Sequence, residues 1–260
     1  MIRLIATDMD GTLLNSQKEI PKDFSAWVCA HPGIYVAIAS GRQYYTLYDE
    51  FPEICDRLIY IADNGALAFY QGEMIHKDVL APEDVKRSLD AVSGLKGVTP
   101  IICGVRCAYM RPSRPEIEAQ GHMYYHRLEF CEDLYACIEQ DEFAKVTYYI
   151  ENFRAAEVRK ELGDLGERLI PIVSGRDWID VNKKGVNKGN AIKEIQTAFG
   201  ISPDESMAFG DYMNDYEMLS CCTESYAMEN ACPEIAKLAK HHTASNDDDG
   251  VMKVLRTLPL

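Results

Sequence analysis

The sequence has little positive charge for its length. Its 260 residues include 27 lysines and arginines against 41 aspartates and glutamates, which gives a formal net charge of −14. An acidic surface repels nucleic acid and anionic lipid, so we expect neither nucleic acid nor a membrane as a partner. A negatively charged ligand would need a cationic site built locally within this acidic protein.

Long hydrophobic runs are also lacking. No stretch approaches a transmembrane span, and MIRLIA at the start is too short an apolar run for a signal peptide. The nine cysteines are scattered and odd in number, which free thiols in a reducing compartment explain best. We therefore expect a cytoplasmic protein. Cys103 and Cys107 lack the second pair that a zinc site of four cysteines needs.

Hydrophobic residues make up 47% of the chain, which is enough for a sizeable core. The apolar runs 2–8, 33–40 and 57–66 are separated by helix-like segments, and strand and helix signals alternate again over 187–258. Continuous apolar strands that alternate with helices predict an α/β fold with a doubly wound, Rossmann-like parallel sheet.

The middle of the chain has a different pattern. Strand-like runs follow one another between residues 82 and 184, interrupted by few helical segments, which predicts an inserted α+β domain with an antiparallel sheet. The tyrosine-rich run 123–130 is assigned to a strand, where His122 and His126 would lie too far apart to share a metal ion easily. We therefore predict a core of residues 1–81 and 185–260 and an insert of residues 82–184.

Two aspartates follow the first predicted strand. Asp8 ends the run IRLIATD, and Asp10 comes two residues later. Ligands gather at the carboxyl ends of parallel strands, and two carboxylates facing the same way there favour a divalent cation. A turn formed by Asp10 and Gly11 would explain the same residues without any ligand.

Three further polar clusters have both a functional and a plain explanation. Ser40 and Gly41 follow the second predicted strand, where they could hold an anion or begin a helix. Lys188 opens a predicted helix, where the helix dipole disfavours a cation unless an anion binds; an exposed lysine is the plain alternative. Its surroundings lack a P-loop pattern. Asp211 would add a third carboxylate, and Asp215 either supports it or caps a helix.

The order of these clusters resembles the haloacid dehalogenase (HAD) superfamily of phosphatases. The matching segments are DMDGT at 8–12, SGR at 40–42, Lys188 and GDYMND at 210–215. The insert is similar in pattern to the large α+β cap of the Cof-like hydrolases within that superfamily, where the cap governs substrate specificity. Asp63 departs from the group, which often has glutamate before the following asparagine; this bears on what enters the site and leaves the chemistry unchanged.

The resemblance implies a Mg²⁺-dependent phosphatase that hydrolyses small phosphoesters, such as sugar phosphates or phosphorylated cofactors, through an aspartyl-phosphate. Asp8 would be the nucleophile, and Asp10 the general acid and base. Asp8, Asp211 and the backbone carbonyl of Asp10 would bind Mg²⁺, and Asp215 would orient the outer shell of the metal. The phosphoryl oxygens would be held by the side chains of Ser40, Lys188 and Asn214 and by the backbone amides of Met9 and Gly41.

Other functions fit part of the same pattern. A phosphomutase could use the same core, and a phospho-accepting signalling or sensor module also combines an aspartate, Mg²⁺ and a lysine. Asp10 argues against a signalling module, whose acyl phosphate must persist. Arg111, Arg114 and Arg127 are either solvated or line the cap, and the acidic run 246–249 is predicted to be a solvated loop. The sequence decides neither the physiological substrate nor whether the protein is a monomer or a dimer.

Overall fold

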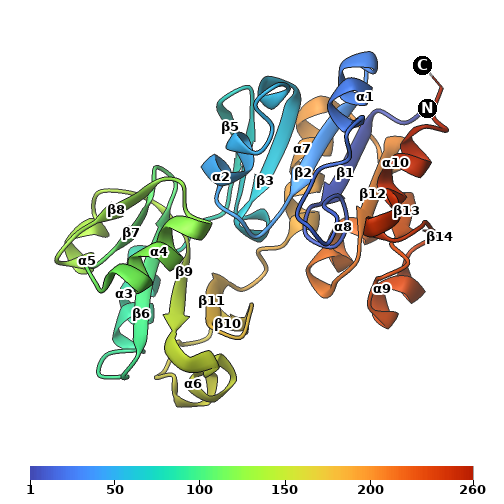
Figure 1. The fold of residues 1–260 in the computed structure, drawn as a ribbon. Helices are drawn as coiled ribbons and strands as arrows, with labels where there is room; N and C mark the ends of the chain where they lie inside the picture. The colour runs from blue at the N-terminus through green and yellow to red at the C-terminus, as the bar shows by residue number, and fades with distance from the viewer. Residues whose placement is uncertain (260) are drawn as a thin grey trace. The chain divides into compact units, whose positions relative to one another are not determined.

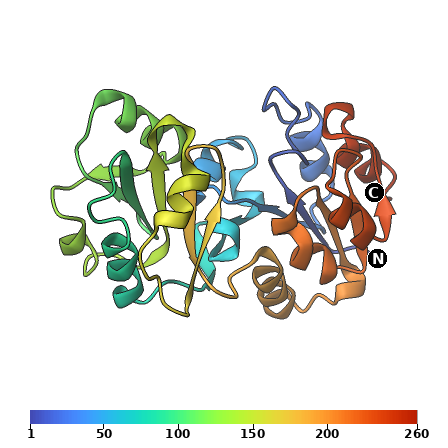
Figure 2. The same cartoon turned by 90° about the horizontal axis from the view of Figure 1, so that it is seen from below.

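The computed structural model describes residues 1–259, which form two compact units. Unit 1 contains Met1–Lys77 and the described residues from Asn187 onward, and unit 2 contains Asp78–Val186. Figures 1 and 2 show the elements of both units in two views. Within residues 1–259, no helix is long and apolar enough to cross a membrane.

Unit 1 is built on an eight-stranded sheet with the order β14-β13-β12-β1-β2-β3-β4-β5. Its parallel strands are β1 (Leu4–Asp8), β2 (Tyr35–Ala39), β3 (Leu58–Ala62), β12 (Ser206–Gly210), β13 (Glu224–Ala227) and β14 (His241–His242). Asp8 pairs with Ala39 in register, so β1 and β2 end at the same edge of the sheet. The predicted parallel α/β sheet is confirmed.

Helices cover both faces of this sheet, as the prediction of a doubly wound fold requires. One face packs on α7 (Lys188–Phe199), α8 (Tyr216–Ser220) and α9 (Pro233–Leu238) through a shared apolar cluster. The other side carries α1 (Phe24–Ala30), α2 (Tyr44–Asp49) and α10 (Gly250–Leu255). There the ring of Tyr44 lies 5.7 Å from that of Tyr60 on β3, and Trp27 donates a hydrogen bond to the carbonyl of Leu255.

One part of the unit 1 sheet was not predicted. The hairpin of β4 (Leu67–Tyr70) and β5 (Glu73–Lys77) extends the sheet antiparallel and was not predicted. Its turn residues, Gln71 and Gly72, both have positive φ, which suits a tight hairpin. Helix α1 begins at Phe24, after Pro21, and residues 241–242 form the short edge strand β14.

Unit 2 is built on a six-stranded sheet with the order β10-β11-β9-β6-β7-β8. Its strands are β6 (Val98–Gly104), β7 (Ala108–Met110), β8 (Leu128–Phe130), β9 (Phe143–Ile150), β10 (Leu169–Val173) and β11 (Trp178–Lys183). Neighbouring strands are antiparallel as predicted, except that β7 and β8 are parallel. One apolar cluster joins the sheet to α3 (Pro82–Asp90), α5 (Leu134–Cys137) and α6 (Ala155–Glu161).

The strand predicted over 123–130 is wrong in its first half. Residues Pro115–Tyr124 form helix α4, and β8 begins only at Leu128. Pro115 in the first turn and Glu116 beside it are favourable at a helix N-terminus. His122 therefore lies on a helix, where its ring packs 5.6 Å from that of Phe130. Local start signals outweighed the tyrosine-rich composition.

Short 3-10 segments join several elements. They are η1 (Cys55–Arg57), η2 (Asp63–Gly65), η3 (Glu151–Phe153), η4 (Pro203–Glu205), η5 (Met213–Asp215) and η6 (Asn246–Asp248). Of these, η2 and η5 bear directly on the site, because η2 contacts the helix α7 and η5 contains Asn214 and Asp215.

Candidate active site

A buried lysine joins two aspartates at the carboxyl edge of the unit 1 sheet. The Nζ atom of Lys188 donates to Oδ1 of Asp8 at 2.5 Å and to Oδ1 of Asp215 at 2.7 Å. Lys188 is 0% exposed, and Asp8 and Asp215 are also buried. A buried charge is costly unless it is paired, and these two carboxylates supply that pairing. The plain alternative, an exposed lysine, is therefore wrong.

The first turn of α7 places Lys188. Asn187 precedes it as the N-cap, and the side-chain oxygen of Asn187 accepts a hydrogen bond from the amide of Asn190 at 2.8 Å. Gly65 lies directly against this turn: a Cβ atom there would stand 2.2 Å from the carbonyl oxygen of Asn187. Gly65 also has a φ of +100°, so glycine is required for both reasons. The segment of residues 63–66 (DNGA) thus sets the position of helix α7, which carries Lys188.

Asp211 completes a group of three carboxylates. Asp8, Asp211 and Asp215 each offer a carboxylate oxygen within 4.8 Å of the others. Thr12 donates to Oδ1 of Asp211 at 2.9 Å. Gly11, with a φ of +86°, leaves the space that this carboxylate occupies, since a Cβ atom there would lie 2.5 Å from its Oδ2. Asp215 differs from its neighbours because its Oδ2 accepts from the amide of Asp211.

The electrostatics of this group suit a cation. Burial, partly offset by Lys188, raises the pKa of Asp8 to about 8. Burial and the charge of Asp215 likewise raise the pKa of Asp211 to about 6. Lys188 offsets only part of the cost of burying these carboxylates, and a bound cation would lower both pKa values. All the donors are oxygens, as Mg²⁺ prefers, so the residues present fit that ion.

Asp10 lies outside the carboxylate group, in a cluster of its own. Its carboxylate accepts from Arg42 at 2.8 Å and from Lys18 at 2.7 Å. Burial alone would raise the pKa of Asp10, but the bonds from Arg42 and Lys18 outweigh it and lower the pKa. Glu50 pairs with the other side of the Arg42 guanidinium. Sequence reasoning did not single out Lys18 or a role for Arg42.

The residues predicted to bind phosphate surround the same edge of the sheet. Ser40 is buried directly after β2, and its hydroxyl accepts from the amide of Arg42 at 3.3 Å. Gly41 lies against Asn64, whose side chain would be 3.0 Å from a Cβ atom on Gly41. Asn214 donates to the side chain of Asn64 at 3.3 Å. Asn64 was missed as a link between the SGR and GDYMND segments; its positive φ of 57° marks the turn.

The fifth predicted phosphate-binding residue, Met9, contributes its backbone to a turn. The carbonyl of Met9 accepts from the amides of Thr12 and Leu14, and its side chain is fully buried. The turn therefore reverses the chain immediately after β1. The backbone amide of Met9 is the group that the resemblance assigns to phosphate.

The acidic loop near the C-terminus holds the segment that follows this turn. Asp247 accepts from both the amide and the hydroxyl of Ser16 at 2.7 Å. Asn246 donates to the carbonyl of Leu14, and Asn230 donates to that of Gly11. The loop predicted to be solvated therefore also anchors the turn that carries Asp10 and Lys18.

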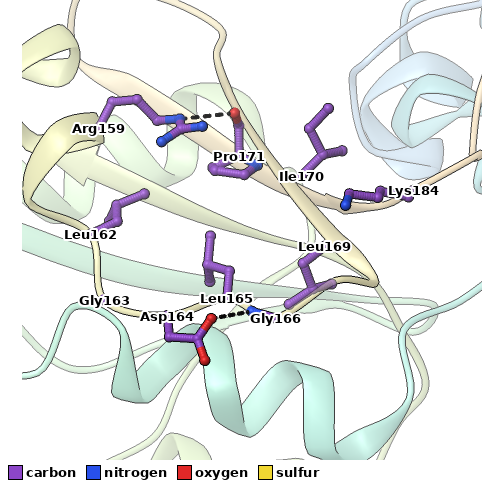
Figure 3. A pocket seen from close by; sticks show the side chains of 10 residues that line it. All are labelled: Arg159, Leu162, Gly163, Asp164, Leu165, Gly166, Leu169, Ile170, Pro171 and Lys184. Atoms are coloured by element: carbon purple, nitrogen blue, oxygen red, sulfur yellow. Dashed lines mark hydrogen bonds between the residues drawn. The ribbon is translucent and has the colours of Figure 1, made fainter.

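A pocket of about 370 Å³ lies elsewhere, and all of its lining comes from unit 2. Figure 3 shows Arg159 donating to the carbonyl of Pro171, and Gly166 donating its amide to Asp164. None of the residues predicted for catalysis lines this pocket. These bonds occupy part of its polar lining, and its size alone does not make it a site.

Comparison with known proteins identifies the class. The sequence profile of the haloacid dehalogenase-like hydrolases matches residues 5–255. The chain belongs to this family, as its motifs predicted, and it is an enzyme of the phosphatase class.

The chain is similar to individual relatives over nearly the full length of both proteins. The chain is 32% identical to 5-amino-6-(5-phospho-D-ribitylamino)uracil phosphatase YbjI of Escherichia coli, over 98% of this chain and 95% of that protein. It is 25% identical to phosphatase YwpJ of Bacillus subtilis, over 99% and 100% of the two chains. The crystal structure of TM0651 from Thermotoga maritima has the same fold, with a TM-score of 0.87, 24% identity and coverage of 100% and 98%.

Proposed function

We propose that this enzyme hydrolyses small phosphoesters with Asp8 as nucleophile and Mg²⁺ as cofactor. The observation that carries the proposal is the buried Lys188, which bonds Asp8 and Asp215 beside a third carboxylate, Asp211. A lone aspartate at a strand end would need no such cation. An aspartate that must approach a dianionic phosphoester does need one.

In this mechanism Asp8 attacks phosphorus and the leaving alcohol departs, which gives an aspartyl-phosphate. Lys188 bonds Oδ1 of Asp8, which fixes the carboxylate and leaves its second oxygen for the attack. Lys188, Ser40, Asn214 and the amides of Met9 and Gly41 then hold the phosphoryl oxygens. Bound Mg²⁺, held by Asp8, Asp211 and the carbonyl of Asp10 with Asp215 supporting them, would neutralise part of the charge on the phosphoryl group.

Asp10 is proposed to protonate the leaving oxygen and then to deprotonate the water that hydrolyses the intermediate. In the structure Arg42 and Lys18 hold this carboxylate ionised. That state suits the second step directly. For the first step, Asp10 must exchange at least one of these cations for a proton, so substrate binding is expected to loosen the cluster.

Small phosphorylated metabolites are the proposed substrates, and unit 2 is proposed to select among them. The relative from Escherichia coli is named for a phosphorylated ribitylaminouracil, which makes phosphorylated polyols attached to a heterocycle the first compounds to test. Unit 2 presents buried polar groups on its sheet: Thr147 donates to Asp180 at 2.6 Å, and Lys145 lies 3.6 Å from the same carboxylate. Such groups suit recognition of a hydroxylated leaving group.

Two substitutions test the chemistry. Asp8→Asn should lower kcat for p-nitrophenyl phosphate by at least about a thousandfold, because it removes the nucleophile. Asp10→Asn should still be phosphorylated on Asp8, since the leaving group, p-nitrophenolate, needs no proton. The aspartyl-phosphate should then accumulate, because Asp10 no longer activates the water that hydrolyses it. The measurements are release of free phosphate and acid-quench trapping of phosphoprotein. If the kcat of Asp8→Asn stayed within tenfold of the wild-type value, Asp8 would not be the nucleophile.

The same assays separate the alternatives. Transfer of phosphate to a second hydroxyl without release of free phosphate would indicate a phosphomutase. A wild-type phosphoprotein that persists in the presence of Mg²⁺ would indicate a signalling module.

A further inference from the structure

Two cysteines of unit 2 lie in direct contact through their sulfur atoms. Cys131 follows β8, Cys137 is the last residue of α5, and their Sγ atoms are 2.8 Å apart. The sulfur atoms of a disulfide lie ~2.05 Å apart. A covalent bond would therefore require the two atoms to approach by less than about one ångström.

The fold anchors both ends of this pair. The amide of Cys131 donates to the carbonyl of Met110 on β7, and the thiol of Cys137 lies 3.6 Å from the carbonyl of Asp133. The side chain of Asp133 caps α5 by accepting from the amide of Tyr135. The hydroxyl of Tyr135 in turn donates to Asp90 on α3 at 2.7 Å. The sulfur contact of Cys131 and Cys137 thus lies where β7, α5 and α3 are held together by hydrogen bonds.

Access differs between the two thiols. Cys137 is 3% exposed, whereas Cys131 is half-buried, so a reagent in solution meets Cys131 first. Cys103 and Cys107, four positions apart in the same unit, offer a contrast: the thiol of Cys103 points to the hydroxyl of Tyr125 at 3.4 Å. In the Cys131–Cys137 pair the two sulfur atoms themselves are in contact.

We propose that Cys131 and Cys137 are a redox modification site that forms a reversible disulfide with a small-molecule disulfide such as oxidised glutathione as the oxidant. The thiolate of Cys131 attacks one sulfur of glutathione disulfide and expels one glutathione thiolate. The Cys137 thiolate then attacks the sulfur of Cys131 and expels the second. Two protein thiols lose two electrons and two protons, and one glutathione disulfide becomes two glutathione thiols.

The environment makes this exchange slow at neutral pH. Burial and the neighbouring Cys137 raise the pKa of Cys131 to about 12, against a smaller opposing effect of the Arg111 charge. The thiolate is the reactive form, so the reduced pair is stable to brief exposure and reacts faster in alkaline buffer. The pair belongs to unit 2 alone, and the inference does not depend on the proposed catalytic function.

The test equilibrates the whole protein with glutathione buffers of increasing oxidising strength, blocks free thiols with N-ethylmaleimide, and maps peptides without reduction. We expect a peptide linked through Cys131 and Cys137, a mass loss of two hydrogen atoms, and full reversal by dithiothreitol. Cys137→Ser should instead carry glutathione on Cys131. Cys107→Ser, the matched control, should form the linked peptide as wild type does.

Two results would overturn the proposal. One is that both thiols stay reactive toward N-ethylmaleimide after prolonged oxidation in alkaline buffer. The other is that wild-type protein accumulates glutathione on Cys131, or links either cysteine to a different partner, without forming the internal bond.

Discussion

At the scale of single residues, the site is organised by one ammonium group. Lys188 is buried between Asp8 and Asp215, and the Asp211 carboxylate lies close to both. Removing the ammonium would leave carboxylates facing one another in a buried setting. We therefore expect Lys188 to matter for folding as well as for its proposed role in holding the phosphoryl group.

Lys188→Met preserves most of the side-chain volume and removes the charge. In EDTA, we expect the free energy of unfolding to fall by about 3–5 kcal/mol, because breaking a buried ion pair leaves its partners uncompensated. Mg²⁺ should recover part of this loss, since it can neutralise the same carboxylates. Urea denaturation with and without Mg²⁺ measures both effects. Lys193→Met, on the exposed side of the same helix, is the control; equal stability of the two variants would contradict the prediction.

Gly11→Ala tests the contact with Asp211. The new methyl group would stand 2.5 Å from the carboxylate and would displace it, so we expect weaker Mg²⁺ binding and lower activity. The positive φ alone costs about 1–2 kcal/mol. Gly72→Ala has a similar φ of +78° with nothing within 4 Å of the new atom, and it isolates that backbone cost. Isothermal titration with Mg²⁺ should distinguish them; matching affinities would show that Asp211 does not need this space.

Much of the candidate site could be predicted residue by residue. Lys188 was a candidate because a lysine at a helix start is unfavourable without an anion, and Asp8 because it ends a buried strand. Both residues kept a plain alternative until the order of the four motifs gave the resemblance that assigns their roles. The cluster of Asp10 with Lys18 and Arg42 could not be found in this way. Lys18 is a lysine in a polar turn, and only the three-dimensional path of that turn brings it to Asp10.

At the scale of elements, the start of α7 decides where Lys188 points. The N-cap of Asn187, the space left by Gly65 and the close packing of Gly189 on α8 all fix this turn. Gly189 has no room for a side chain, since a Cβ atom would lie 2.5 Å from the backbone of Glu217. The first turn is therefore held from three sides before any ligand binds.

Asn187→Ala should fray this turn. Loss of an N-cap costs about 1 kcal/mol, and we expect kcat to fall as well because Lys188 is the next residue. Asp133→Ala removes the corresponding cap of α5 in unit 2 and should cost a similar amount without lowering hydrolysis of p-nitrophenyl phosphate. Thermal unfolding and steady-state kinetics of both variants give the comparison. An equal loss of activity in the two would mean that the effect is not specific to α7.

Element prediction succeeded where apolar runs were continuous and failed where composition misled. The continuous apolar runs of β1, β2 and β3 identified the parallel sheet. The β4–β5 hairpin was missed because its strands are short and its turn, Gln71-Gly72, is a weak signal. In the insert, tyrosines suggested a strand over 123–130, but the helix that begins at Pro115 runs on to Tyr124. Burial of Ile117 and Gly121 on that helix depends on tertiary packing.

At the scale of the whole molecule, the net charge of −14 and the cationic groups of the site act over different distances. The acidic surface repels polyanions from afar, and this repulsion weakens as salt shortens the Debye length. Lys188, Lys18 and Arg42 act only at contact distance. A small phosphoester with a charge of about −2 is repelled far less than a nucleic acid chain.

Salt dependence can separate charge from enclosure as the reason for preferring small substrates. We compare a panel of small phosphoesters with a 5′-phosphorylated oligonucleotide, at about 20 mM and about 150 mM salt, where the Debye length falls from roughly 20 to 8 Å. If repulsion were the whole cause, kcat/KM for the oligonucleotide would approach the small-molecule values at the higher salt. We expect kcat/KM for the oligonucleotide to stay below every one of them, because the inserted unit is proposed to select compact leaving groups.

An Asp180→Asn variant should change the ranking within the small-molecule panel. Lys188→Met should instead lower kcat/KM for all members together, since Lys188 is proposed to bind the shared phosphoryl group. Hydrolysis of the oligonucleotide with a higher kcat/KM than the whole panel would show that the insert does not limit substrate size.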